Sequence, residues 1–232
     1  MDNIKVRDTG HRYEPEDLGI RTHGIGESRT LDFHSPYGCS KGCADQYVLD
    51  YARMYKLPML VFRMSCIYGP HQFGSEDQGW VAHFVLQLLR NKPITIFGDG
   101  KQVRDVLYVE DLVDALLLAR KHINLLQGKP YNIGGGVANT LNLQELLVML
   151  KQVHGKLPQV RYGNWRPGDQ RYYVSDIRRF SQATGWQPKY AVNEGIAFLY
   201  QWLHDFHELT ESPAAPLHYR EIAMPPMAME GV

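Results

Sequence analysis

The sequence has no net charge, very little cysteine and no long apolar run, and each absence excludes a class of protein. Lysine plus arginine equals aspartate plus glutamate, at 25 each among 232 residues, which argues against a general binder of nucleic acid or acidic membranes. There is no run of about 18 apolar residues and no signal-like start. Cys39, Cys43 and Cys66 form no CxxC pair, so we expect reduced thiols and no metal site. These features predict a cytoplasmic protein.

A further absence concerns the placement of glycine. Dinucleotide-binding proteins hold the cofactor pyrophosphate at a glycine-rich turn between the first strand and the first helix. No GxGxxG or GxxGxxG pattern precedes Tyr37. Residues 1–30 are polar and glycine-rich without sustained periodicity, so we expect a loop or insertion there. The cluster Gly134, Gly135 and Gly136 lacks a further glycine at the required spacing, which favours a tight strand-to-loop turn.

The remaining composition is that of a globular protein. With 44% hydrophobic and 22% charged residues, the chain can bury a core as one or two domains. Residues 57–67 form an apolar run broken by Arg63, typical of a buried parallel strand. The glycine turn 98–100 predicts that strands 94–97 and 102–108 form a hairpin-like pair. We expect a further strand over 160–162, helices over 35–56, 80–90, 109–126, 141–154, 175–184 and 192–207, and a flexible tail over 209–232.

Tyr37 and Lys41 stand four residues apart at the start of the first expected helix. Four residues turn a helix by about 400°, so the two side chains share one face. A free phenol titrates near ~10, too high for a base at neutral pH, and a neighbouring ammonium favours the phenolate form. The pair is therefore a candidate acid/base site. Because the pattern is short, the alternative is two ordinary surface residues of a helix.

Longer stretches carry a resemblance to a known family. The segment from Ser35 to Lys41, followed by a helix pattern and the strand-like run to residue 70, resembles the active-site helix of the extended short-chain dehydrogenase/reductases, the NAD-dependent epimerase/dehydratase family. Residues 31–37, 72–73, 77–80 and 100–107 are similar to the CDP-paratose 2-epimerase (CDP-tyvelose epimerase) branch. The resemblance runs from about Leu31 to about Phe206. It covers the second half of such an enzyme, without the N-terminal cofactor-binding half.

The resemblance implies roles for particular residues. They are catalytic Tyr37 and Lys41, cofactor-binding Tyr37, Lys41 and Ser65, and substrate-binding Ser65, Gln72, Gln78, Arg104 and Arg171. Arg104 would bind the diphosphate through two parallel hydrogen bonds, which a guanidinium group can form. The alternative is that Arg104 is a surface arginine paired with Asp105. Arg171 belongs to a loop that would close over the nucleotide, or else to a solvated loop. No residue matches the family's catalytic Ser or Thr.

The predicted fold class is α/β, with an incomplete Rossmann-like parallel sheet and a smaller α+β lobe that binds a nucleotide sugar. We expect a loop or insertion over 1–30, a remnant of the dinucleotide-binding domain over 31–92, mainly the substrate-binding lobe over 93–208, and the tail. The resemblance implies an NAD-dependent epimerase acting on a CDP- or UDP-linked sugar. The alternative is a catalytically inactive fragment or nucleotide-sugar-binding module. Either would need a homodimer partner or a complementing N-terminal half to cover its apolar surface.

Overall fold

The computed structural model describes residues 4–156 and 159–211. Its helices are α1 (Leu18–His23), α2 (Pro36–Tyr55), α3 (Trp80–Leu89), α4 (Val109–Lys121), α5 (Ile123–Leu126), α6 (Leu143–His154), α7 (Arg178–Thr184) and α8 (Val192–Glu211). Its strands are β1 (Val6–Asp8), β2 (Tyr13–Pro15), β3 (Val61–Met64), β4 (Cys66–Tyr68), β5 (Ile94–Phe97), β6 (Val103–Tyr108), β7 (Pro130–Ile133), β8 (Thr140–Leu141), β9 (Val160–Gly163) and β10 (Tyr172–Tyr173). Within this described part, no helix is long and apolar enough to cross a membrane.

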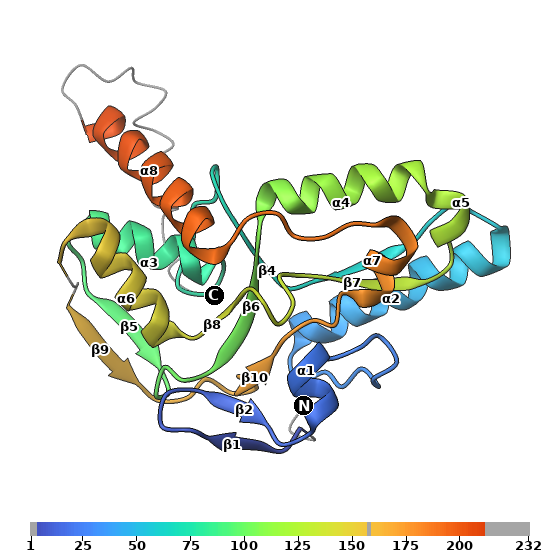
Figure 1. Cartoon of the computed structure of the whole chain (residues 1–232), viewed down its shortest axis with the longest axis horizontal. Coiled ribbons are helices and arrows are strands. Elements are labelled where there is room, and N and C mark those ends of the chain that lie inside the picture. Colours follow the sequence, from blue (N-terminus) through green and yellow to red (C-terminus); the bar gives the residue numbers. More distant parts are fainter. Residues whose placement is uncertain (1–3, 157–158, 212–232) are drawn as a thin grey trace, which may run out of the picture.

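Parallel strand pairs with helices packed around them make the fold α/β and Rossmann-like. β3 pairs with β7, β4 with β6 and β5 with β9, each in parallel. β10 adds to β6 in parallel and β8 adds to it antiparallel. In Figure 1, β5, β9, α3, α6 and α8 gather on one side, α2, α4, α5, α7 and β7 gather on the other, and β6 runs between them. The predicted fold class is therefore confirmed.

Two hydrophobic clusters stabilise these two groups of elements. In the first, α3, α6 and α8 pack on β5 and β6, and Val85, Leu150 and Leu199 are fully buried. In the second, α4 and α7 pack against β7, and Ile133 and Phe180 are fully buried. Complete burial of side chains of this size stabilises the fold by about 1.5–3 kcal/mol each. The boundary between the two clusters runs along β6, which contributes to both.

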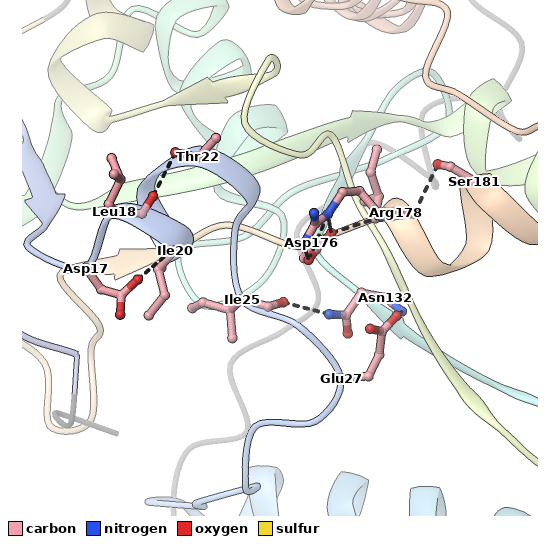
Figure 2. Close-up of polar contacts among 11 residues, drawn as sticks. Asp17, Leu18, Ile20, Thr22, Ile25, Glu27, Asn132, Asp176, Arg178 and Ser181 are labelled. Carbon is pink, nitrogen blue, oxygen red and sulfur yellow. Dashed lines mark hydrogen bonds and ion pairs between the residues drawn. The ribbon is translucent and has the colours of Figure 1, made fainter.

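The N-terminal segment is more regular than its sequence predicts. β1 and β2 form an antiparallel hairpin, and α1 follows it with Asp17 as its N-cap, so the expectation of a plain loop over 1–30 is wrong there. Strands of three residues and a helix of six are too short to show periodicity. Ile25 then pairs with the segment at Ser175, and Figure 2 shows its carbonyl accepting a bond from Asn132 Nδ2, at 2.8 Å. The N-terminal segment is thus hydrogen-bonded to β7 and to the segment at Ser175.

Several predicted boundaries change in the folded chain. β5 and β6 do not form a hairpin-like pair, because β5 takes β9 as its partner and the almost wholly buried β6 takes β4, β8 and β10. The run 57–67 divides at Ser65 into β3 and β4, which have different partners. The helix expected over 109–126 is interrupted at His122, and α7 begins only at Arg178, after the bridge to Ile25. α8 continues to Glu211, so only residues 212–232 of the expected tail lie outside the described residues.

Candidate functional site

Helix α2 presents Tyr37 and Lys41 together, as their spacing predicts. Ser35 caps the helix by accepting a bond from the N–H of Gly38 at 3.0 Å, and Pro36 occupies its first turn. Lys41 Nζ lies 5.5 Å from the centroid of the Tyr37 ring. Both side chains are exposed, and Tyr37 is 61% accessible. The phenol and the ammonium are therefore close to each other and open to a ligand.

A buried ion pair fixes α2 against β3. Arg63 donates from Nε and Nη2 to the two carboxylate oxygens of Asp45, at 2.7 and 3.0 Å, and from Nη1 to the carbonyl of Glu27 at 3.2 Å. Asp45 lies eight residues after Tyr37, on the sheet-facing side of the helix. Gly42 leaves room for the Phe33 ring, since a Cβ there would lie 2.0 Å from it. The Tyr–Lys face is thereby held in a fixed orientation.

Ser65 lies at the break between β3 and β4, where it faces a buried carboxylate. Its hydroxyl contacts both the backbone carbonyl and the carboxylate of Asp105. The same carboxylate accepts a bond from the N–H of Gly136 at 3.1 Å, and burial raises the pKa of Asp105. A Cβ on Gly135 would lie 2.2 Å from the Val106 carbonyl, so the glycine cluster serves close packing. This supports its interpretation as a tight strand-to-loop turn.

A cavity of about 330 Å³ opens beside the first turn of α3. Loop 76–79, helix α3, strands β5 and β6 and loop 166–169 contribute its walls. Trp80, Phe84 and Phe97 contribute aromatic rings, and Arg104 and Arg166 contribute guanidinium groups beside the carboxylates of Glu76, Asp77 and Asp169. We call it the cationic cavity after its two arginines. No side chain caps α3 by accepting a hydrogen bond from its first turn. The partial positive charge of this helix start adds to the two guanidinium groups.

The two arginines are each paired with an acid. Arg104 Nη2 donates to Asp169 at 2.8 Å and Nη1 donates to the Val103 carbonyl at 2.9 Å, which leaves further N–H donors of its five. Arg166 lies 3.9 Å from the Phe97 ring centroid and 3.4 Å from Asp77, whose side chain is 87% exposed. The predicted alternative, a pairing of Arg104 with Asp105, does not occur. An anion would have to compete with exposed Asp77 for Arg166.

Two further polar side chains face the same cavity. Gln102 is 5% exposed and donates from Nε2 to the Phe97 carbonyl at 2.8 Å, while its buried Oε1 has no protein partner. Such an acceptor costs free energy unless a ligand or water donates to it. His83 lies on α3, and burial lowers its pKa. The sequence did not single out His83, Arg166 or, within the matched stretch 100–107, Gln102, because only the fold brings α3, the start of β6 and loop 166–169 together.

The other predicted site residues lie outside this cavity. Gln72 Nε2 bonds to the Ile67 carbonyl at 3.1 Å beneath loop 76–79, and Gln78 is exposed on that loop. Arg171 lies over the rings of Tyr13 and Trp165 and lines a separate polar cavity of about 450 Å³.

Tyr37 and Lys41 do not line the cationic cavity either. The loop that carries Arg166 and Asp169 connects the two places, because Gly168 packs against His34, three residues before Tyr37. Among residues 4–156 and 159–211, no three His, Cys, Asp or Glu side chains form a group that could hold a metal ion. The site therefore consists of a cationic, partly aromatic cavity and, beyond this loop, an exposed Tyr–Lys pair.

These features define a class of protein. The sequence model of the NAD dependent epimerase/dehydratase family matches residues 16–134, just over half of the chain, and the chain belongs to this family. CDP-paratose 2-epimerase of Salmonella typhi is 42% identical over 209 residues, covering 87% of this chain and 60% of that protein. A putative UDP-glucose 4-epimerase of Methanocaldococcus jannaschii is 31% identical over 179 residues, covering 77% of this chain and 56% of that protein.

Solved structures show the same relationship. UDP-glucuronic acid 4-epimerase from Bacillus cereus, in complex with UDP-glucuronic acid and NAD, superposes with a TM-score of 0.72 at 26% identity, over 78% of this chain and 56% of that one. UDP-glucose 4-epimerase from Thermotoga maritima, with UDP-glucose, gives a TM-score of 0.72 at 33% identity, over 79% and 58%. The chain thus spans little more than half the length of the relatives that it matches.

Proposed function

We propose that the chain binds a nucleotide sugar in the cationic cavity and contributes the acid/base residue of an NAD-dependent epimerase. The observation that carries this proposal is the cavity itself, which sets two guanidinium groups and a helix start beside an aromatic wall. Diphosphates favour paired guanidinium groups and helix N-termini, and nucleobases favour aromatic faces. The similarity to a CDP-paratose 2-epimerase supports a CDP-linked sugar, and the similarity to UDP-sugar epimerases supports a UDP-linked one.

In this proposal Tyr37 is the acid/base. As the phenolate it takes a proton from a sugar hydroxyl, and as the phenol it returns that proton. Lys41, 5.5 Å from the ring centroid, offers its ammonium to ribose hydroxyls. NAD, when bound, supplies the chemistry of hydride removal and return. Because Tyr37 and Lys41 are exposed, they fit the nicotinamide end of that cofactor, and Ser65 is the third residue that we propose near it.

The remaining substrate contacts are proposals of the same kind. Arg104 and Arg166 hold the diphosphate, and Gln72 and Gln78 lie below and on the loop that forms one wall. Arg171 would reach the nucleotide only after a movement away from Tyr13 and Trp165. It lines a neighbouring cavity that shares Arg166 and Asp169 with the cationic cavity, so we propose that it is a peripheral contact of the nucleotide.

A second candidate is a nucleotide-sugar-binding module without catalysis of its own. The observation that favours it is the separation of the cavity from Tyr37, since the proposed acid/base residue does not line the cavity that would bind the sugar nucleotide. A homodimer partner or a complementing N-terminal half would then supply the rest. The apolar outer face of α2 supports such a partner, with Tyr47, Tyr51 and Met54 each at least half exposed.

Replacement of Arg104 tests the proposed function. A charge-assisted bidentate contact contributes about 1.5–3 kcal/mol, so Arg104→Ala should weaken binding of UDP-glucose or CDP-glucose by roughly tenfold or more in calorimetric titration. Arg161→Ala is the matched control, because Arg161 is an exposed arginine of β9 that does not line the cavity. Equal affinity of the parent, Arg104→Ala and Arg161→Ala would exclude the cavity as the nucleotide site.

A further inference from the structure

The N-terminal hairpin contains a tyrosine that contacts residues adjoining two walls of the cationic cavity, the end of β5 and loop 166–169. Tyr13, on β2, is 8% exposed, and its hydroxyl donates to Asp99 Oδ2 at 2.6 Å. Its ring centroid lies 6.4 Å from that of Trp165, and Arg171 Cζ lies 5.3 Å from the Tyr13 centroid. One side chain therefore contacts the turn after β5 and both ends of loop 165–171.

Asp99 belongs to the turn that ends the aromatic wall. β5 finishes at Phe97, whose ring lies under Arg166. Asp99 accepts a bond from the Lys101 N–H at 3.0 Å, and its carbonyl accepts one from Gln144 at 2.7 Å. The Tyr13 hydroxyl adds a bond that crosses from the hairpin to this turn.

Trp165 immediately precedes Arg166, so the packing of Trp165 helps to fix the backbone from which the second guanidinium extends. Gly98 permits its placement, since a Cβ at Gly98 would lie 2.7 Å from the Trp165 ring. Trp165 is 39% exposed and is packed between Gly98 and Tyr13. Loss of the Tyr13 ring would remove one contact of the indole, whose ring centroid also lies 5.9 Å from Arg171 Cζ.

The hairpin is itself fixed to the lobe that forms the cavity. Arg12 donates from Nε and Nη2 to the carboxylate of Glu145 on α6, at 3.1 and 2.6 Å. Asn142 Nδ2 donates to the His11 carbonyl at 2.9 Å, and the Tyr13 N–H donates to the Lys101 carbonyl at 3.2 Å. Tyr13 therefore stands on a rigid support.

We propose that Tyr13 is a positioning residue of the cationic cavity, acting through Trp165 and Asp99 to hold Arg166 and Asp169 in place for a diphosphate. This inference rests on the proposed function. Arg166 and Asp169 lie on a loop, and ordering a loop side chain on binding costs free energy that prior fixation removes. The hairpin, whose residues were expected from sequence to be a loop or insertion, becomes an outer support of the nucleotide site in this proposal.

The test compares Tyr13→Ala and Tyr13→Phe with Tyr162→Ala, a change to an exposed tyrosine of β9. Calorimetric titration with UDP-glucose should give a dissociation constant raised about three- to tenfold in Tyr13→Ala, the range expected when one or two side chains must be ordered on binding. Tyr13→Phe keeps the ring and should restore most of the affinity. Amide exchange of residues 164–171 in the ligand-free chain should quicken in Tyr13→Ala alone.

A double-mutant cycle separates positioning from a general structural role. If Tyr13 acts through Arg166, Tyr13→Ala should change the affinity less than about twofold in an Arg166→Ala background. Fully additive effects would overturn the proposal. Should Tyr13→Ala fail to fold, Trp165→Ala carries the same comparison, because it removes the ring through which Tyr13 is proposed to act.

Arg104→Ala, measured beside these variants, distinguishes the two possible failures. If Arg104→Ala loses affinity while Tyr13→Ala matches Tyr162→Ala, the role of Tyr13 is excluded and the proposed function stands. If the parent binds no nucleotide sugar, both are excluded.

Discussion

Asp45 and Arg63 form the ion pair on which the orientation of the Tyr–Lys face depends. The Asp45 side chain is 9% exposed and that of Arg63 is 18% exposed. Removing one partner of a buried pair leaves an uncompensated charge, which costs about 3–5 kcal/mol. We expect Asp45→Ala to lower the free energy of unfolding by about 3 kcal/mol, near the bottom of that range because the pair is not fully buried. Urea unfolding followed by circular dichroism measures this loss.

An exposed pair on the same helix provides the control. Arg53 and Asp50 are bonded one turn apart, with side chains 75% and 51% exposed. Exposed pairs contribute little, so Asp50→Ala should change the free energy of unfolding by less than about 0.5 kcal/mol. Similar losses in Asp45→Ala and Asp50→Ala would show that the buried pair does not hold α2.

Under the proposed function, His83 should make nucleotide-sugar binding depend on pH in a definite direction. Burial lowers its pKa below 6.5, and Arg166 and Arg90 add to this while Glu76 opposes it. A bound diphosphate favours the protonated ring, so binding takes up a proton. We expect UDP-glucose, whose diphosphate does not titrate near neutrality, to bind more tightly as the pH falls from 7 towards 5.5. Calorimetry in two buffers of different ionisation enthalpy measures the proton uptake.

His83→Asn removes the titrating group and should abolish this pH dependence. His154 is the comparison residue, because burial also lowers its pKa but it bonds Tyr200 and does not line the cavity. His154→Asn should keep the pH dependence of the parent. Affinity that falls with falling pH in the parent would contradict the placement of His83 near the diphosphate.

At the scale of elements, Asn142 both caps the start of α6 and bonds this helix to the N-terminal hairpin. Asn142 Oδ1 accepts a bond from the Glu145 N–H at 2.8 Å, and Glu145 Oε2 accepts one from the Asn142 N–H at 2.9 Å. Loss of an N-cap costs about 1 kcal/mol, and Asn142 also donates to the His11 carbonyl. Asn142→Ala should therefore lower the free energy of unfolding by about 1–2 kcal/mol. Asn142→Asp keeps the cap acceptor but loses the donor, so thermal unfolding should show a smaller loss.

Sequence patterns predicted the helices and strands correctly where the signals lie within the element itself. α2, α3, α6 and β5 lie within a few residues of their predicted ranges, because the helices carry caps or apolar stripes and β5 ends in a glycine turn. The patterns failed where the pairing of a strand depends on a segment that is distant in sequence. The pairing of β5 with β9 rather than β6, and the bridge from Ile25 to Ser175, depend on contacts that local spacing does not encode.

The candidate site divides in the same way. The face shared by Tyr37 and Lys41 follows from helix geometry alone, and Arg104 was identified through its motif and lines the cavity. Arg166, Gln102 and His83 come from three separate elements and were not predicted. The assignment of Arg171 stays a prediction, since that side chain stands outside the cavity with Tyr13.

At the scale of the whole molecule, the described residues offer more binding groups to a nucleotide sugar than to NAD. The nucleotide sugar meets a cavity with two arginines and an aromatic wall. For NAD, the described residues offer Tyr37 and Lys41, with Ser65 already bonded to Asp105. The N–H of Gly136 is bonded to Asp105 and is therefore not available to a pyrophosphate.

We therefore expect these 232 residues to bind UDP-glucose or CDP-glucose but to bind NAD weakly or not at all. Two or three hydrogen bonds to the nicotinamide end supply about 1 kcal/mol each, against at least ~4 kcal/mol for immobilising the ligand. Calorimetric titration with NAD should show no saturable binding, and acid extracts of the purified chain should contain no NAD by chromatography. UDP-glucose in the same calorimeter is the positive control. Recovery of NAD at one molecule per chain would contradict this expectation and reveal a pyrophosphate site in residues 1–30 or around Gly134.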